Sequence, residues 1–114
     1  MKRHKFGVGD KARRTVDGIV FHSIAESKRY GELKLLAAAG EISDLELQPK
    51  FEWQTTYSAN ERRMWAKHFY RADFAYINVA GERIIEDVKG FKTREYKRKK
   101  KIVESLYRVE IIEI

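Results

Sequence analysis

Residues 71–90 have the sequence RADFAYINVAGERIIEDVKG, in which two apolar segments are separated by Val79-Ala80-Gly81. A three-residue loop with glycine in a left-handed conformation is typical of a tight β-hairpin. If the residues that flank this loop pair with each other, Asp73 lies directly opposite Asp87 in the neighbouring strand. The sequence therefore predicts an antiparallel strand pair that carries two facing carboxylates at its open end.

These two carboxylates are expected to share a face of the sheet with an amine. Side chains two residues apart in a strand point to the same side, so Asp87 and Lys89 project together and Glu86 projects the other way. Two anions that face each other across a ladder repel, and a cation offsets that cost. Oxygen ligands without cysteine or clustered histidine favour Mg²⁺, with Mn²⁺ as a substitute. A metal site at Asp73 and Asp87 is one interpretation, and a structural ion pair with Lys89 is the other.

A helix with a single acidic residue on its apolar side is expected upstream. Ser23-Ile24-Ala25-Glu26 has the S-x-x-E form of a capping box, and Gly40 suits the end of a helix. One helical stripe between these signals is apolar except at its first position: Glu26, Tyr30, Leu33 and Ala37. This stripe should dock on the sheet with Glu26 pointing at it. Glu26 is then either a third metal ligand or only the residue that closes the capping box.

The segment between helix and hairpin is predicted to contain one strand and one loop. Residues 45–53 alternate apolar and polar side chains, which is typical of a half-buried strand, and Pro49 pushes that strand toward a sheet edge or a bulge. Residues 54–63 are polar and are expected to form a loop.

The element order predicts the fold class. A second helix is expected from about residue 94 to residue 106, followed by a last strand over residues 108–114. The order helix, three strands, helix, strand indicates a single α/β domain over residues 1–114 with a mixed sheet. Residues 1–18 lack periodicity and are expected to form a basic N-terminal arm, with a strand at most around residues 18–21.

Composition and charge limit the classes of partner that the protein could bind. The chain has no cysteine, which excludes disulfides and thiolate metal sites, and no apolar run long enough to span a membrane. Its net charge of +7 is concentrated in residues 1–14 and 92–101. Basic segments on an otherwise mildly acidic chain indicate a polyanionic partner such as nucleic acid, with a solvated tail and helix face as the alternative.

Eight cations from these two segments are expected to bind DNA phosphates without reading sequence: Lys92, Arg94, Lys97, Arg98, Lys100, Lys101, Arg13 and Arg14.

Two further residues are candidates for supporting roles at the site. Gln48 could hydrogen-bond a ligand or water, although a solvent-facing glutamine at a strand edge is the simpler interpretation. Tyr96 could lean over the site, although its spacing also fits a core stripe. Four aromatic residues could stack on bases but are by default assigned to the core: Trp53, Trp65, Phe69 and Tyr70.

These residues resemble the PD-(D/E)xK nuclease superfamily, whose restriction-endonuclease-like core has the order helix, three strands, helix, strand. In that superfamily the first helix contributes a Glu, the second strand an Asp, and the third strand an acid-x-Lys motif. Glu26, Asp73, and Asp87 with Lys89 stand at these positions. The proline that commonly precedes the Asp is replaced by Ala72.

Nearly the whole chain also resembles a family of small phage and prophage nuclease-like proteins, with S-x-x-E, LQPKF, A-D-F and E-D-V-K-G segments. The resemblance implies an Mg²⁺-dependent endodeoxyribonuclease in which Glu26, Asp73 and Asp87 hold the metal and Lys89 assists the attacking water. Archaeal-type Holliday junction resolvases are the nearest functional analogy. We accordingly expect branched or duplex DNA as partner, a homodimer, no small-molecule cofactor, no membrane, and the bacterial host cytoplasm as location.

Two other classes of function fit the same residues. One is a non-catalytic, basic DNA-binding protein that assists recombination on a degenerate nuclease fold. The other is a structural or assembly protein whose basic arm contacts packaged nucleic acid. Neither requires a metal site, so metal binding separates them from the nuclease.

Overall fold

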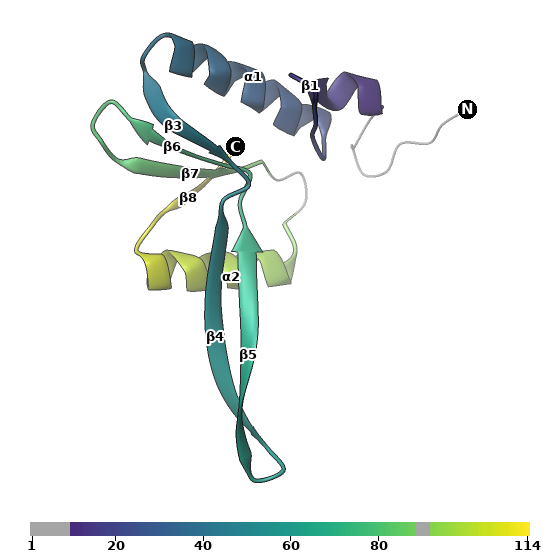
Figure 1. The fold of residues 1–114 in the computed structure, drawn as a ribbon, viewed down its shortest axis with the longest axis vertical. Coiled ribbons are helices and arrows are strands. Elements are labelled where there is room, and N and C mark those ends of the chain that lie inside the picture. The colour runs from purple at the N-terminus through teal and green to yellow at the C-terminus, as the bar shows by residue number, and fades with distance from the viewer. Residues whose placement is uncertain (1–9, 89–91) are drawn as a thin grey trace.

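A four-stranded mixed sheet with one helix on each face forms the body of the protein in the computed structural model, which describes residues 10–88 and 92–114 (Figure 1). In spatial order the strands are β3 (Ile42–Leu47), β6 (Phe74–Asn78), β7 (Arg83–Asp87) and β8 (Ile111–Glu113). The first three are antiparallel neighbours, and β8 runs parallel to β7. The expected α/β class, with its order of helix, three core strands, helix and strand, is confirmed.

The hairpin of β6 and β7 has the register that the sequence predicts. Phe74 lies opposite Glu86, and Ile77 lies opposite Arg83. Gly81 has a φ of +82°, the left-handed conformation that the loop requires. The pairing continues past β6, because the N–H of Asp73 donates a 3.1 Å hydrogen bond to the carbonyl of Glu86. Asp73 and Asp87 therefore lie at the same end of the hairpin.

The helix α1 (Ile24–Ala38) covers one face of the sheet. Its N-terminus is capped by Ser23, whose Oγ accepts a 3.1 Å hydrogen bond from the N–H of Glu26. Leu33 is completely buried and packs in one cluster with Phe74 and Tyr76 of β6. The predicted helix and the stripe that docks it are confirmed.

The helix α2 (Arg94–Tyr107) covers the opposite face. Val103 of α2 packs in a second cluster with Ala75 and Ile85, whose neighbours in sequence face α1. This alternation is the period-two pattern of strands buried on both sides. In Figure 1 the N-terminal ends of α1 and α2 lie at the same end of the sheet.

The prediction of an irregular basic arm is wrong for residues 10–18, the part of it that the structure describes. Residues 10–18 contain a 3₁₀ helix, η1 (Lys11–Arg14), and the strand β1 (Thr15–Val16), which pairs with β2 (Ile19–Val20). The turn between the strands is Asp17-Gly18, both with positive φ, as in a two-residue hairpin turn. Asp17 accepts a 3.0 Å hydrogen bond from the hydroxyl of Tyr30, which ties the small hairpin to α1. Residues 1–9 of the expected arm lie outside the described residues.

The expected single strand over residues 45–53 is also wrong. The chain turns at Gln48, which has a φ of +51°, and at Pro49, which lacks the N–H needed to continue a ladder. Beyond this corner β4 (Lys50–Ala59) leaves the central sheet and pairs only with β5 (Arg62–Arg71). The part before the corner, β3, is an edge strand as Pro49 suggested.

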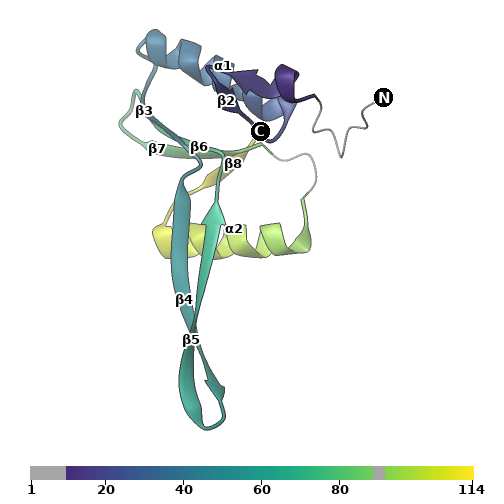
Figure 2. The same ribbon diagram turned by 45° about the vertical axis from the view of Figure 1, so that its right-hand side comes forward.

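The expected loop over residues 54–63 is instead the outer half of this second hairpin. Ten residue pairs join β4 to β5, and only Asn60 and Glu61 form the turn. The hairpin projects beyond α2 in both ribbon views (Figures 1 and 2). Its outer residues are polar because no other element covers them, which explains why the sequence pattern suggested a loop. In residues 10–88 and 92–114, no helix has both the length and the hydropathy that crossing a bilayer demands.

Candidate functional site: an acidic pocket at the hairpin end

A pocket of about 350 Å³ opens beside the N-terminus of α1, and three distant segments of the chain contribute its polar walls. Glu26 comes from the first turn of α1, Gln48 from the corner between β3 and β4, and Asp73 from the residue before β6. The remaining lining residues are Ile19, Val20, Phe21, His22 and Leu47. The fold thus brings together three of the residues that the sequence singled out.

Asp73 is held by backbone hydrogen bonds on two sides. Its Oδ2 accepts a 2.7 Å hydrogen bond from the N–H of Val88, just past the end of β7. Its carbonyl accepts a 2.9 Å hydrogen bond from the N–H of Gln48. The side chain is buried, with 9% of the residue exposed. Asp73 therefore has a fixed position between the β3–β4 corner and the end of β7.

Asp87 lies next to this contact but on the side of the sheet that faces α2. It is fully buried, and its carbonyl accepts a 3.0 Å hydrogen bond from the N–H of Ile114. The pKa of the Tyr96 hydroxyl on α2 is raised by burial, by a hydrogen bond to Glu113 and by the charge of Asp87. Among the described residues, the walls of the acidic pocket do not include Asp87. The bond from Val88 to Asp73 nevertheless places the Asp73 carboxylate beside the peptide that follows Asp87.

Glu26 is 4% exposed and lines the pocket. Its Oε2 lies 3.8 Å from Nδ1 of His22. Its N–H is bound by Ser23, so Glu26 takes part in the helix cap through its backbone while its side chain lines the pocket. The bond to Ser23 Oγ is one half of the capping box, and the other half, like a metal site, would use the Glu26 carboxylate, so the two interpretations compete for the same oxygens.

The donor set suits a cation that keeps part of its water shell. In the part of the chain that the structure describes, no three acidic or histidine side chains are arranged to hold a metal ion. Mg²⁺, however, is commonly bound by one or two carboxylates, with waters and substrate phosphates completing the shell. The carboxylates of Glu26 and Asp73 with the amide oxygen of Gln48 fit that description. Lys89 lies outside the described residues.

Glu86, the competing acid of the motif, has a structural role. It is 1% exposed and faces α1, where Arg29 binds both carboxylate oxygens at 2.7 and 2.6 Å. Tyr76 also donates its hydroxyl hydrogen to this carboxylate. The same contact to Glu86 raises the pKa of Arg29, and burial together with the Glu86 hydrogen bond raises the pKa of Tyr76 to about 12. Strand alternation correctly separated Glu86 from Asp87.

The predicted phosphate-binding cations differ in how free they are. Arg94, Lys97, Arg98 and Lys101 are exposed on α2, and Arg13 is exposed on η1. Lys92 and Lys100 lie 3.2 and 3.6 Å from Glu113, so a phosphate would compete with that carboxylate. Arg14 is half-buried, and its Nη1 donates a 2.6 Å hydrogen bond to the carbonyl of Phe21. The exposed α2 cations are the freest of the described set.

Sequence reasoning missed one residue at the site and misassigned two aromatic residues on the projecting hairpin. His22 lines the pocket, and its position four residues before Glu26 was the available signal. The core assignment holds for Tyr70, which is 6% exposed, and Trp53 is half-buried. It is wrong for Trp65 and Phe69, which are 63% and 50% exposed on the projecting hairpin.

Fold and site together define a mixed α/β domain with an acidic pocket beside α1 and a basic helix, α2, on the opposite face of the sheet. The chain belongs to the family described as "Protein of unknown function (DUF1064)", whose model matches residues 3–112. No curated protein and no solved structure matches the chain.

Proposed function

We propose that this protein is a divalent-metal-dependent DNA endonuclease of the PD-(D/E)xK type. The observation that carries the proposal is the convergence of Glu26, Gln48 and Asp73 on one pocket, with Asp87 at the adjacent strand end. Glu26, Gln48 and Asp73 are separated from one another by 22 or more residues in the chain, and Glu26, Asp73 and Asp87 stand at the motif positions that the resemblance predicts. An acidic pocket and a basic helix that begins at the same end of the sheet suit a metal ion and a phosphodiester together.

Each residue has a defined part in this proposal. Glu26 and Asp73, which line one pocket, would hold Mg²⁺, and the role of Asp87 as a third ligand rests on the motif alone. The ion would supply polarisation of a phosphoryl oxygen and a lowered pKa of a bound water. Asp73 is pre-oriented by the N–H of Val88, so its carboxylate needs little rearrangement. Gln48 can hydrogen-bond a water or a phosphate oxygen at the pocket wall. The role of Lys89, to assist deprotonation of the attacking water, rests on the motif alone.

The basic face of α2 would hold the DNA backbone. Arg94, Lys97, Arg98 and Lys101 neutralise phosphates without reading bases, which suits an enzyme that recognises DNA structure rather than sequence. A homodimer with two sites would suit paired cuts in a symmetric four-way junction. We place this activity in phage replication or recombination, inside the bacterial host.

The test is a cleavage panel in Mg²⁺ and in Mn²⁺ with labelled four-way junctions, flaps, duplexes and single strands. We expect wild-type protein to cut at least one branched substrate, and Asp73→Asn, Asp87→Asn and Glu26→Gln to reduce the rate at least about 100-fold, as is usual when a group that stabilises the transition state is lost. Glu32→Gln is the matched control, because Glu32 lies on the same helix as Glu26 but is exposed.

Two outcomes would overturn the proposal. Wild-type protein that binds DNA in a salt-dependent way but cuts nothing in either metal would favour the non-catalytic DNA-binding protein. Full cleavage by folded Asp73→Asn and Asp87→Asn variants would place the chemistry elsewhere. Calorimetry with Mn²⁺ adds a readout that does not depend on activity, and binding should weaken in Asp73→Asn but not in Glu32→Gln.

A further inference from the structure

The projecting hairpin of β4 and β5 has one face on which cations and aromatic rings alternate. Along β5 this face carries five exposed residues: Arg63, Trp65, Lys67, Phe69 and Arg71. Their partners across the ladder in β4 are also exposed: Ser58, Thr56, Gln54, Glu52 and Lys50. The face therefore holds four cations, one carboxylate and two large rings. We call it the outer face of the hairpin.

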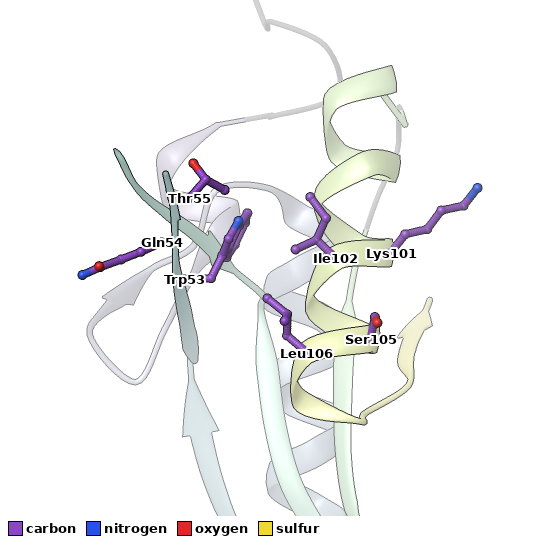
Figure 3. Close-up of a pocket in the computed structure, with 7 residues that line it drawn as sticks. All are labelled: Trp53, Gln54, Thr55, Lys101, Ile102, Ser105 and Leu106. Atoms are coloured by element: carbon purple, nitrogen blue, oxygen red, sulfur yellow. The ribbon is translucent and has the colours of Figure 1, made fainter. Parts of the chain in front are cut away.

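The inner face of the hairpin, in contrast, packs against α2 near its base. Phe51 and Tyr70 are buried in the core cluster of α2, and the hydroxyl of Tyr107 accepts a 3.1 Å hydrogen bond from the N–H of Glu52. Further along, Trp53 points toward Ile102 and Leu106 of α2, whereas Gln54 points away from that helix (Figure 3). Packing against α2 thus fixes the hairpin and leaves the outer face open.

The two rings of the outer face are not explained by folding. Trp65 is 63% exposed and Phe69 is 50% exposed, although each is large enough to contribute strongly to a core. Cations on an isolated hairpin can be explained as protection against edge-to-edge aggregation. Exposed rings act against that protection, so solubility accounts for the cations and not for the rings.

The cations are gathered around one of the rings. The Nζ atoms of Lys50 and Lys99 lie 5.0 and 5.7 Å from the centre of the Phe69 ring, and the Arg71 guanidinium lies 5.9 Å from it. Such contacts are favourable singly, and two of these cations also pair with a carboxylate: Lys50 with Glu52 at 3.2 Å and Lys99 with Glu95 at 3.4 Å. The outer face still carries four cations against the single carboxylate of Glu52, and this net positive charge is the complementarity that identifies a polyanion as the partner.

The cluster also connects the hairpin to the rest of the site. A groove of about 360 Å³ runs from Phe69 and Arg71 to the first turn of α2, where Thr93 and Tyr96 line it. Arg71, the last residue of β5, lies two residues before Asp73 of the acidic pocket. A DNA strand that lies along the outer face is therefore directed toward the end of the sheet that carries the acidic residues.

We propose that the outer face of the β4–β5 hairpin binds DNA with unpaired bases, by stacking bases on Trp65 and Phe69 and pairing phosphates with the cations between them. Residues two apart in a strand are about 7 Å from each other, so ring and charge alternate along an extended chain. In a duplex the base faces cover each other, whereas the bases of a single strand or a branch point are free to stack on rings. The inference deepens the nuclease proposal by naming its substrate class, and it rests on that proposal for the link to cleavage.

The test measures binding without cleavage. Fluorescence anisotropy in EDTA at fixed salt compares a labelled oligo-dT with a labelled hairpin duplex that has no unpaired ends. We expect oligo-dT to bind more tightly, and Trp65→Ala and Phe69→Ala each to weaken it about 5- to 150-fold, the range measured for loss of one stacking ring. Tyr57→Ala is the matched control, since Tyr57 is exposed on the inner face of the same hairpin and should bind normally.

Three outcomes would overturn the inference. Equal binding of oligo-dT by wild type, Trp65→Ala and Phe69→Ala would show that bases do not stack on these two rings. Preferential binding of the duplex would indicate a ribbon that enters the major groove instead. Dissociation of a wild-type dimer by Trp65→Ala in sedimentation would identify the outer face as a contact between two copies. The two proposals can fail separately. If Asp73→Asn loses cleavage but Trp65→Ala binds oligo-dT normally, the nuclease proposal stands and the stacking inference fails. If binding depends on the rings but the protein cuts nothing, the stacking inference stands and the nuclease proposal fails.

Discussion

Asp73 Oδ2 accepts a 2.7 Å hydrogen bond from the backbone N–H of Val88, which links the start of β6 to the end of β7. The bond fixes a buried carboxylate at the one end of the sheet where Glu26 and Gln48 also converge. It has a structural part, the acceptance of an N–H, and an electrostatic part, the negative charge. Substitutions can separate the two.

Asp73→Ala removes both parts, whereas Asp73→Asn keeps an acceptor oxygen and removes the charge. We expect Asp73→Ala to lower the free energy of unfolding by about 1–3 kcal/mol, because the part-buried N–H of Val88 loses its partner. Asp73→Asn should lose clearly less than Asp73→Ala. Urea denaturation of the three proteins measures the difference, and equal losses in both variants would show that the hydrogen bond contributes nothing to stability.

Arg29→Met should destabilise the fold more than Asp73→Ala does. It leaves the Glu86 carboxylate, 1% exposed, without its cation, and such a loss typically costs about 3–5 kcal/mol. Glu32→Ala removes the exposed partner of the same guanidinium and should cost less than about 1 kcal/mol. The double variant Arg29→Met/Glu86→Leu should recover much of the loss, since it removes the buried charge as well. A loss below about 1 kcal/mol in Arg29→Met, measured by urea denaturation, would contradict the structural role of Glu86.

The contact between Asp17 and α1 should make stability depend on pH. The Tyr30 hydroxyl and the Lys34 ammonium, 3.0 and 3.3 Å away, hold the pKa of Asp17 below its ordinary value of 3.8. A carboxyl group whose pKa is lower in the folded state stabilises the fold above its unfolded pKa, and the gain is lost as pH falls through the folded pKa. Wild type should therefore be more stable than Asp17→Asn at pH 7, with the gap closing below pH 3.8. A gap that is unchanged at pH 3 would show that the charge is not its source.

The exposed cations of α2 should set the salt dependence of DNA binding. Each phosphate contact contributes a slope of about −0.9 to a plot of log K against log salt concentration for duplex DNA. Lys97→Ala and Arg98→Ala should each weaken binding of all sequences alike and make this slope about one unit shallower. Lys28→Ala, an exposed cation on α1, should change neither quantity. An unchanged slope in the α2 variants would move the DNA path away from this helix.

Local signals were sufficient for much of the fold. The capping residue Ser23, the left-handed Gly81 and the alternation of β6 and β7 involve neighbours within a few positions, so their geometry can be derived from spacing. The facing ends at Asp73 and Asp87 followed from that register. The contact of Arg29 with Glu86 joins residues 57 positions apart, and spacing carries no information about such a pair.

The sequence by itself determined the two helices, the β6–β7 register and the positions of its acidic residues, because caps, turns and side-chain alternation act over short range. Only the tertiary structure decided that the chain turns out of the sheet at Gln48 and Pro49, that residues 50–71 form a hairpin separate from the central sheet, and that Glu26 and Asp73 share a pocket. A polar strand is stabilised by pairing and by the helix beneath its base, and a pocket is made by segments that meet only after folding. Both depend on distant partners that no local pattern names.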